Sequence, residues 1–168
     1  MNKVNIVYYS FTGNTLRMVK AFEKGLQEAG VPFSNAFTIL KVLPVKAFEK
    51  GLQEAGVPFK SYSVVELKND DEAFDCEILA LASPANQTEA IEKEYFQPFL
   101  KRNAERFKDK KVYLFGTFGW GTGMYMGHWI KEVEKLGAKI VELPMACKGS
   151  PNSETKEKLQ ELAKKIAT

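Results

Sequence analysis

The sequence predicts an α/β fold in which helices cover both faces of a parallel sheet. Short apolar runs of strand length alternate along the chain with longer amphipathic stretches of helical period. Because neighbouring parallel strands must be joined by a crossover, strict alternation of strand and helix is typical of a doubly wound sheet. With 168 residues, 45% hydrophobic and 27% charged, the chain is expected to form one domain over residues 1–168.

The first half of the chain contains three predicted strands and two predicted helices. The strands are expected at residues 3–9 (KVNIVYY), 37–43 (FTILKVL) and 62–67 (YSVVEL). A helix follows the first strand, with its apolar residues on one side and Gly30 at its end. A second helix lies between the other two strands, with Pro44 suited to its first turn.

The second half continues the alternation. Strands are expected at residues 77–83 (EILALAS), 111–117 (KVYLFGT) and 138–144 (AKIVELP). Helices are expected at residues 88–107, 123–136 and 153–167, and residues 68–75 form a loop or a short turn of helix. Each apolar run is of strand length and far too short to cross a membrane.

A long exact repeat interrupts this pattern. Residues 19–33 (VKAFEKGLQEAGVPF) recur letter for letter at residues 45–59, an offset of 26. The strands that follow, residues 37–42 and 62–67, share an order of aromatic, hydroxyl, apolar, apolar, charged and apolar residues. We therefore interpret the repeat as a recent or deliberate duplication of a helix-plus-strand unit, which can extend a parallel sheet by one right-handed crossover. The alternative is that one copy is looped out or swapped.

Polar and small residues follow the first predicted strand, where the first helix begins. They are Ser10, Phe11, Thr12, Gly13, Asn14 and Thr15. Backbone N–H groups at the amino end of a helix point outward without partners, and the helix dipole there favours an anion. Hydroxyl and amide groups add neutral donors, so the loop suits a phosphate group, although the same composition is also typical of a helix cap. Neither a P-loop nor a GxGxxG fingerprint occurs here.

Two further loops follow predicted strands at the same edge of the sheet. One comprises Ser83, Pro84, Ala85, Asn86, Gln87 and Thr88. The other comprises Phe118, Gly119, Trp120, Gly121, Thr122 and Gly123, in which glycines flank an aromatic ring. Ligands of doubly wound sheets bind outside the carboxyl ends of the strands, so the three loops together suit a phosphorylated planar cofactor. For Trp120 alone, the alternative is a hydrophobic plug.

These motifs resemble those of short-chain flavodoxins of the clostridial type. The resemblance includes S-x-T-G-N-T at residues 10–15 and extends through residues 77–100 and 114–138, and it covers the chain except for one 26-residue unit. It implies an electron carrier, not an enzyme, that binds FMN non-covalently and passes single electrons at low potential to redox partner proteins. The residues implied to bind FMN are those of the three loops, Thr122 excepted. The first loop would hold the phosphate and Trp120 would cover one face of the isoalloxazine.

The repeat leaves two sheet orders open. A flavodoxin has five strands in the order 2-1-3-4-5. If the repeated unit adds a strand beside the first, the flavodoxin-like sheet has six strands in the Rossmann-like order 3-2-1-4-5-6, and this is the order we expect. If one copy is looped out, the five-stranded order remains.

Three features depart from the family pattern. Gln87 stands where these proteins often have a glycine, so a positive φ is harder to reach there. Thr122 stands where an acidic residue is common beside the tryptophan. Flavodoxins are usually strongly acidic, whereas this chain has a net charge of +3 and a pI of about 8.7.

The cysteines, the charge and the single histidine limit the location of the protein and the ligands that it can bind. Cys76 and Cys147 cannot form a disulfide framework, and the chain enters a strand pattern without a recognisable signal peptide, so we expect a cytoplasmic protein. The mild, interleaved charge argues against nucleic-acid binding, and no apolar run argues for a membrane. His128 lacks partners at metal-ligand spacing. We expect a monomer without a metal.

Two other functions are compatible with the same residues. One is an engineered or evolutionary-intermediate scaffold that keeps the fold without an electron-transfer role. The other is a flavin enzyme that uses NAD(P)H directly, but no nicotinamide-binding motif supports it.

Overall fold

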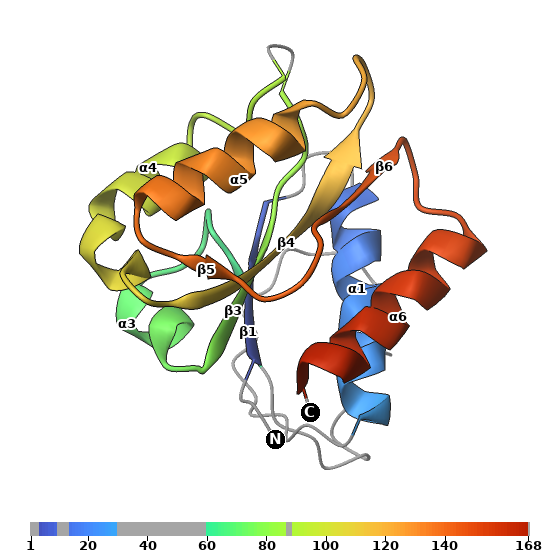
Figure 1. Ribbon diagram of the computed structural model, residues 1–168, viewed down its shortest axis with the longest axis horizontal. Helices are drawn as coiled ribbons and strands as arrows, with labels where there is room; N and C mark the ends of the chain where they lie inside the picture. The colour runs from blue at the N-terminus through green and yellow to red at the C-terminus, as the bar shows by residue number, and fades with distance from the viewer. Residues whose placement is uncertain (1–3, 10–13, 30–59, 87–88, 168) are drawn as a thin grey trace.

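The computed structural model describes residues 4–9, 14–29, 60–86 and 89–167 (Figure 1). Its strands are β1 (Val4–Tyr8), β2 (Lys60–Ser63), β3 (Ile78–Ala82), β4 (Lys111–Phe118), β5 (Lys139–Ile140) and β6 (Met145–Lys148). Its helices are α1 (Asn14–Glu28), α3 (Asp70–Phe74), α4 (Phe96–Arg102), α5 (Tyr125–Lys135) and α6 (Ser153–Ala167), with a 3-10 turn η1 at Ala104–Phe107.

These strands form one parallel sheet in the order β2-β1-β3-β4-β5, and β6 also pairs with β4. The register places Val4 of β1 beside Ile78 of β3, and Val112 of β4 beside Ile140 of β5. Helices lie on both faces, with α1 and α6 on one and α3, α4 and α5 on the other (Figure 1). The prediction of a doubly wound, flavodoxin-like α/β sheet is therefore confirmed.

Alternation along the strands divides the interior into two apolar cores. On β1, Val4 and Ile6 belong to the core under α1 and α6, whereas Val7 belongs to the opposite core. In the first core the Phe22 ring lies 5.5 Å from the Tyr113 ring. In the second, Trp129 of α5 meets Phe96 edge-on, with 5.5 Å between ring centroids. Both faces of the sheet are covered by packed helices, which explains why β1, β3 and β4 are nearly continuous apolar runs.

Helices α1 and α6 approach each other closely at Gly25. A Cβ atom placed on Gly25 would lie 2.0 Å from the carbonyl oxygen of Gln160 in α6. No L side chain can be accommodated at that distance, so the glycine permits the backbone contact. The contact fixes α6 beside the helix whose amino end faces the predicted phosphate site.

The last predicted strand, residues 138–144, is divided in the structure, and this prediction needs correction. Val112 of β4 pairs with Ile140, and Phe115 of β4 pairs with Met145. From the first pair to the second, β4 advances by three residues, whereas the segment paired with it advances by five. The two surplus residues interrupt the strand, and Pro144 has no N–H with which to continue the ladder. Consequently β5 ends at Ile140 and pairing resumes as β6, which the sequence did not predict.

Strand β2 lies earlier than its predicted range of 62–67. The Val64 N–H still donates to the Tyr8 carbonyl, but the N–H groups of Glu66 and Leu67 then turn back to the Ser63 carbonyl. This turn ends the strand.

The predicted helix at residues 88–107 is also much shorter than expected. Ala85 and Ile91 form an antiparallel bridge, and the Glu92 carboxylate accepts hydrogen bonds from the N–H groups of Tyr95 and Phe96 at 2.8 and 2.9 Å. Glu92 therefore caps α4 at its amino end, and Pro98 fits the first turn because it needs no donor there. Beyond α4 the chain tightens into η1.

The predicted strand at residues 37–43 and the second repeat copy at residues 45–59 lie outside the described residues. The sixth strand of this sheet is β6, a different segment. Because β1 pairs with β2 on one side and with β3 on the other, no strand lies between β1 and β2. The expected order 3-2-1-4-5-6 is therefore wrong, and the alternative order 2-1-3-4-5 is observed. Among the described helices, none combines the length and the apolar composition needed to cross a bilayer.

Candidate functional site

The three predicted loops follow β1, β3 and β4, and because these strands are parallel the loops lie at one edge of the sheet (Figure 1). Residues 10–13 and residues 87–88 lie outside the described part of the chain. The site is therefore built from the residues that flank them, from the β3–α4 connection and from the β4–α5 connection.

The first loop connects β1 to α1. Asn14 and Thr15 form the first turn of α1, so the predicted phosphate loop leads directly into a helix amino end. That first turn contains no acidic residue. The positive end of the helix dipole is therefore not neutralised from within the turn, which favours an anionic ligand there.

The second loop begins by extending the sheet. Ser83 is fully buried; its hydroxyl donates to the Pro84 carbonyl at 3.1 Å and accepts from the Glu92 N–H at 3.3 Å. The Ala85 N–H donates to the Thr117 carbonyl at 2.8 Å, which continues the ladder with β4. Ser83 and Ala85 thus fix the course of the loop.

Asn86 closes a tight turn within this loop. Its side-chain amide donates to the Ile91 carbonyl at 3.0 Å, and its side-chain oxygen accepts from the Ala90 N–H at 3.2 Å. Its backbone N–H donates to the Ala90 carbonyl at 2.7 Å. The Asn86 side chain therefore shapes the turn that presents residues 87–88, and a direct contact with a ligand stays a prediction.

The third loop presents Trp120, whose side chain is 85% exposed. Phe118, the last residue of β4, packs its ring against Tyr125, with 6.4 Å between centroids. Gly119 has open space on its side-chain side, with no atom within 4 Å of a Cβ placed there. An exposed flat ring beside an open backbone gives a planar ligand room to stack. The predicted exposed ring is present, and the hydrophobic plug is not.

Glu89 joins the second and third loops. Its carboxylate accepts from the Thr122 N–H at 2.8 Å and from the Tyr125 N–H at 3.1 Å, and so caps α5. Its carbonyl oxygen lies 3.2 Å from Nδ1 of the exposed His128. A Cβ on Gly121 would fall 1.6 Å from Glu89 Oε1, and Gly121 itself has φ of +77°. A glycine is therefore required where the carboxylate crosses.

Sequence reasoning missed Glu89, and it assigned Gly121 to the FMN-binding loop without its contact with Glu89. The available signal was the start of α5, because residues 123–125 (GMY) contain no side chain suited to an amino-terminal cap. A second missed feature is the stack of Tyr9 on Tyr95, with 5.8 Å between centroids, beside the carboxyl end of β1.

Burial sets the protonation of two tyrosines at this edge. Burial raises the pKa of Tyr125, and the nearby Cys147 and Glu89 raise it further. The neutral Tyr125 hydroxyl donates to the Ser83 carbonyl at 3.4 Å. Desolvation also raises the pKa of Tyr9, which lies close to Glu92 and Glu94. Both phenols stay neutral near pH 7, so neither places an anion beside the predicted phosphate site.

The described residues fit FMN. Trp120 and the open space at Gly119 suit a planar ring, and the amino end of α1 suits a phosphate. The described part of the chain contains no cluster of His, Cys, Asp and Glu side chains that could hold a metal ion. Fold and site together define a doubly wound α/β protein whose loops at the carboxyl ends of the strands suit a planar, phosphorylated ligand.

Comparison with known proteins leads to the same class. The chain is 30% identical over 164 residues to a flavodoxin of Clostridium beijerinckii, covering 98% of this chain and 99% of the relative. It is 28% identical over 162 residues to a flavodoxin of Megasphaera elsdenii, covering 96% and 98%. The solution structure of two-electron reduced Megasphaera elsdenii flavodoxin matches with a TM-score of 0.71 at 29% identity, covering 96% and 98%. No protein-family model matches the chain.

The chain belongs to the flavodoxin family. Flavodoxins are FMN-binding electron carriers, not enzymes, and they transfer electrons to redox partners. The electron-transfer function predicted from the sequence is confirmed at this level, and the comparisons give the scaffold alternative no better support.

Proposed function

We propose that this chain is a low-potential one-electron carrier that binds FMN at the edge formed by the loops after β1, β3 and β4. When bound, FMN supplies the redox chemistry. Residues 10–15 and the amino end of α1 bind its phosphate, and Trp120 covers one face of its ring system. Residues 83–88 approach the ring edge, and Glu89 keeps that loop at a fixed position relative to Trp120.

One observation carries this proposal: Trp120 is 85% exposed, on a loop that positive-φ glycines and the Glu89 carboxylate hold in place. Leaving a large aromatic ring in water is unfavourable, and a ring on a fixed loop loses little conformational entropy when a ligand covers it. The residues of the other two loops are consistent with a bound flavin whose phosphate accepts hydrogen bonds from uncharged donors.

Several finer features belong to the same proposal. We place the protein in the cytoplasm as a monomer of one domain over residues 1–168. We also propose that residues 19–44 and 45–67 are two copies of one helix-plus-strand unit, the second rewritten in its strand. The identity of the two 15-residue segments supports a common origin.

Substitution of Trp120 by alanine tests the proposed stacking. Loss of an aromatic contact should weaken FMN binding by about 1–2 kcal/mol, roughly fivefold to thirtyfold in Kd. In the unmodified chain, tryptophan fluorescence should be quenched on FMN addition, and in Trp120→Ala the remaining quenching should be much smaller. Trp129 serves as the internal reference, because it is fully buried and packs against Phe96 in the core between α5 and the sheet.

Equal FMN affinity and equal quenching in the two proteins would show that Trp120 does not cover the ring. Circular dichroism of the flavin-free variant should be unchanged, because Trp120 contributes almost nothing to the described core.

A further inference from the structure

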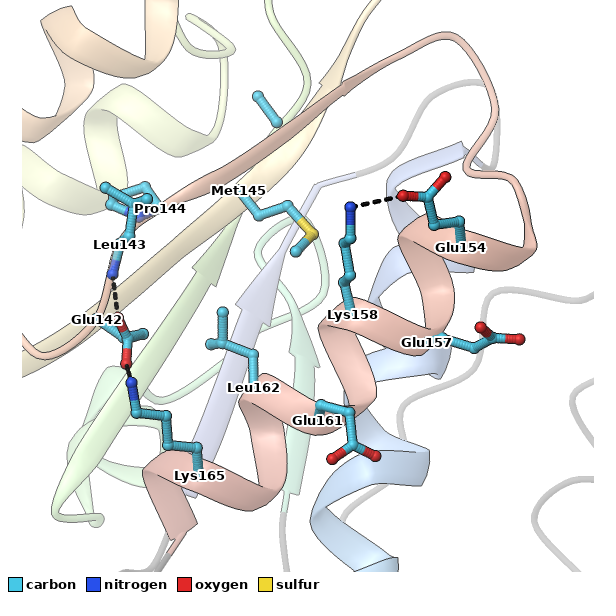
Figure 2. Close-up of a pocket in the computed structure, with 11 residues that line it drawn as sticks. Glu142, Leu143, Pro144, Met145, Glu154, Glu157, Lys158, Glu161, Leu162 and Lys165 are labelled. Carbon is cyan, nitrogen blue, oxygen red and sulfur yellow. Dashed lines mark hydrogen bonds and ion pairs between the residues drawn. The ribbon is translucent and has the colours of Figure 1, made fainter.

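A groove runs along the outer edge of the sheet, between α6 and the segment that joins β5 to β6 (Figure 2). Its volume is about 880 Å³. Leu143, Pro144 and Met145 line one side, and Leu162 lines the helix side. Met145 and Leu162 point into the space between the two walls (Figure 2). None of its lining residues is a proposed FMN contact.

The groove follows from the surplus of two residues between β5 and β6. This interruption lets the strand segment bow outward, and it leaves Leu143 78% exposed. In the described part of the chain no strand lies beyond β5 and β6, so no described segment covers this edge. An exposed leucine beside a proline and a methionine makes a continuous apolar surface, not a single scattered side chain.

Charged side chains surround this apolar surface with an excess of negative charge. They are Glu142, Glu154, Glu157, Glu161, Lys158 and Lys165. Lys158 Nζ lies 2.6 Å from Glu154 Oε1, and Lys165 pairs with Glu142 (Figure 2). Four glutamates against two lysines give the groove a net charge of −2, in a chain whose net charge is +3. Both cations of the groove are already engaged by its own carboxylates.

We propose that this groove is a docking site for a partner protein that presents a cationic amphipathic segment. Apolar side chains of the segment would cover Leu143, Met145 and Leu162, while its lysines or arginines would face the glutamates. Charge complementarity of this kind selects partners and speeds encounter. A second copy of this chain is disfavoured as the occupant, because a symmetric contact would bring two grooves of charge −2 together. The proposal is independent of FMN binding.

Two short helical peptides test the chemistry directly on the full-length, FMN-loaded protein. One contains leucine and lysine in an amphipathic pattern, and the other has glutamate in place of every lysine. Calorimetry should show that the lysine peptide binds at least roughly tenfold more tightly. If binding were non-specific, the net charge of +3 would favour the glutamate peptide over the lysine peptide. The comparison therefore separates binding in the groove from non-specific binding. Backbone amide NMR shifts should concentrate at residues 142–146 and 154–165.

Single substitutions locate the contact. Glu157→Lys should weaken the lysine peptide about fivefold, and Leu143→Ser should weaken it about as much through lost apolar contact. Glu134→Lys is the matched control, because Glu134 is exposed on α5 and the substitution changes the net charge equally. That control should leave the affinity within about twofold.

Three results of the binding experiments would overturn the proposal, and a fourth comes from sedimentation. They are equal affinity for the two peptides, NMR shifts centred on another surface, and equal weakening by Glu157→Lys and Glu134→Lys. Self-association in sedimentation experiments that Leu143→Ser abolishes would identify a second copy as the occupant, and would overturn it as well.

Discussion

Glu23 shows how burial changes the chemistry of a single side chain in this fold. It lies on α1 beside strand β2 and is only 5% exposed, and Ser61 donates a hydrogen bond to its carboxylate. Burial raises the pKa of Glu23 from 4.5 to about 7, against the lowering effects of Ser61 and Lys20. Below about pH 7 the folded protein therefore holds Glu23 mainly in its protonated form.

Stability should consequently fall with rising pH across the range from 4.5 to about 7. The unfolded chain releases this proton first, so the contribution of Glu23 is complete below pH 4.5 and is lost as pH passes 7. The loss amounts to about 3 kcal/mol in the free energy of unfolding. Urea denaturation at several pH values should show that Glu23→Gln removes this slope and is the more stable protein at pH 8. Glu134→Gln, at an exposed position on α5, should keep the slope; an unchanged slope in Glu23→Gln would refute the assignment.

Residues differ in how much of their role the sequence reveals. Trp120 could be predicted, because glycines on both sides of an aromatic residue after a buried strand indicate a presented ring. Glu89 could not, because its partners Thr122 and Tyr125 lie more than thirty residues away and their N–H groups carry no signal of their own. Asn86 was predicted as a ligand donor; its side-chain amide shapes the turn of its own loop, and its contact with a ligand stays a prediction.

At the scale of elements, the sequence predicts best where both faces of a segment are buried. The apolar runs of β3 and β4 are found within one residue of their predicted ends. The division between β5 and β6 could not be predicted, because it depends on a register shift against β4 and not on local composition. The start of α4 could not be predicted either, because the Glu92 carboxylate caps the helix at Tyr95 and Phe96. The helical sequence pattern begins several residues earlier and gives no sign of this cap.

The contact between α1 and α6 gives a test at the same scale. Gly25→Ala should destabilise the protein by about 1–3 kcal/mol, because the added Cβ would lie 2.0 Å from the Gln160 carbonyl and must push the helices apart. Gly127→Ala is the matched control, since a Cβ on this α5 glycine meets nothing within 4 Å. The control should raise stability by up to about 1 kcal/mol through helix propensity. Thermal denaturation measures both, and equal effects of the two substitutions would contradict the close packing.

At the scale of the whole molecule, the exact repeat of residues 19–33 at residues 45–59 is the most unusual feature of the chain. The described strands keep the order β2-β1-β3-β4-β5, and α1 is formed by the first copy, in direct connection with the predicted phosphate loop. The sequence predicted the doubly wound class because alternation is a property of the whole chain. It left the position of residues 37–43 open, because a good buried strand can either join a sheet or be looped out.

Deletion of one unit tests whether the rest of the molecule is self-sufficient. Removing residues 19–44 or residues 34–59 gives the same chain, because the copies are identical, and leaves 142 of the 168 residues. We expect that chain to fold and to bind FMN with an affinity within about tenfold of the full-length protein. The reason is that the deleted unit contains none of the proposed FMN-binding residues. Failure to fold would show that the second unit is an integral part of the core.

Titration of the full-length protein with FMN shows whether the chain carries one FMN at the edge built from three loops. Residues 41–44 (KVLP) directly precede the second helix copy, and the positions that correspond to TGNT at residues 12–15 read TILK at residues 38–41. Pro44 also lacks a donor N–H, so only one phosphate site is expected. Flavin absorbance and tryptophan quenching should both saturate at one equivalent per chain. Saturation near two equivalents, or no binding at all, would contradict the account.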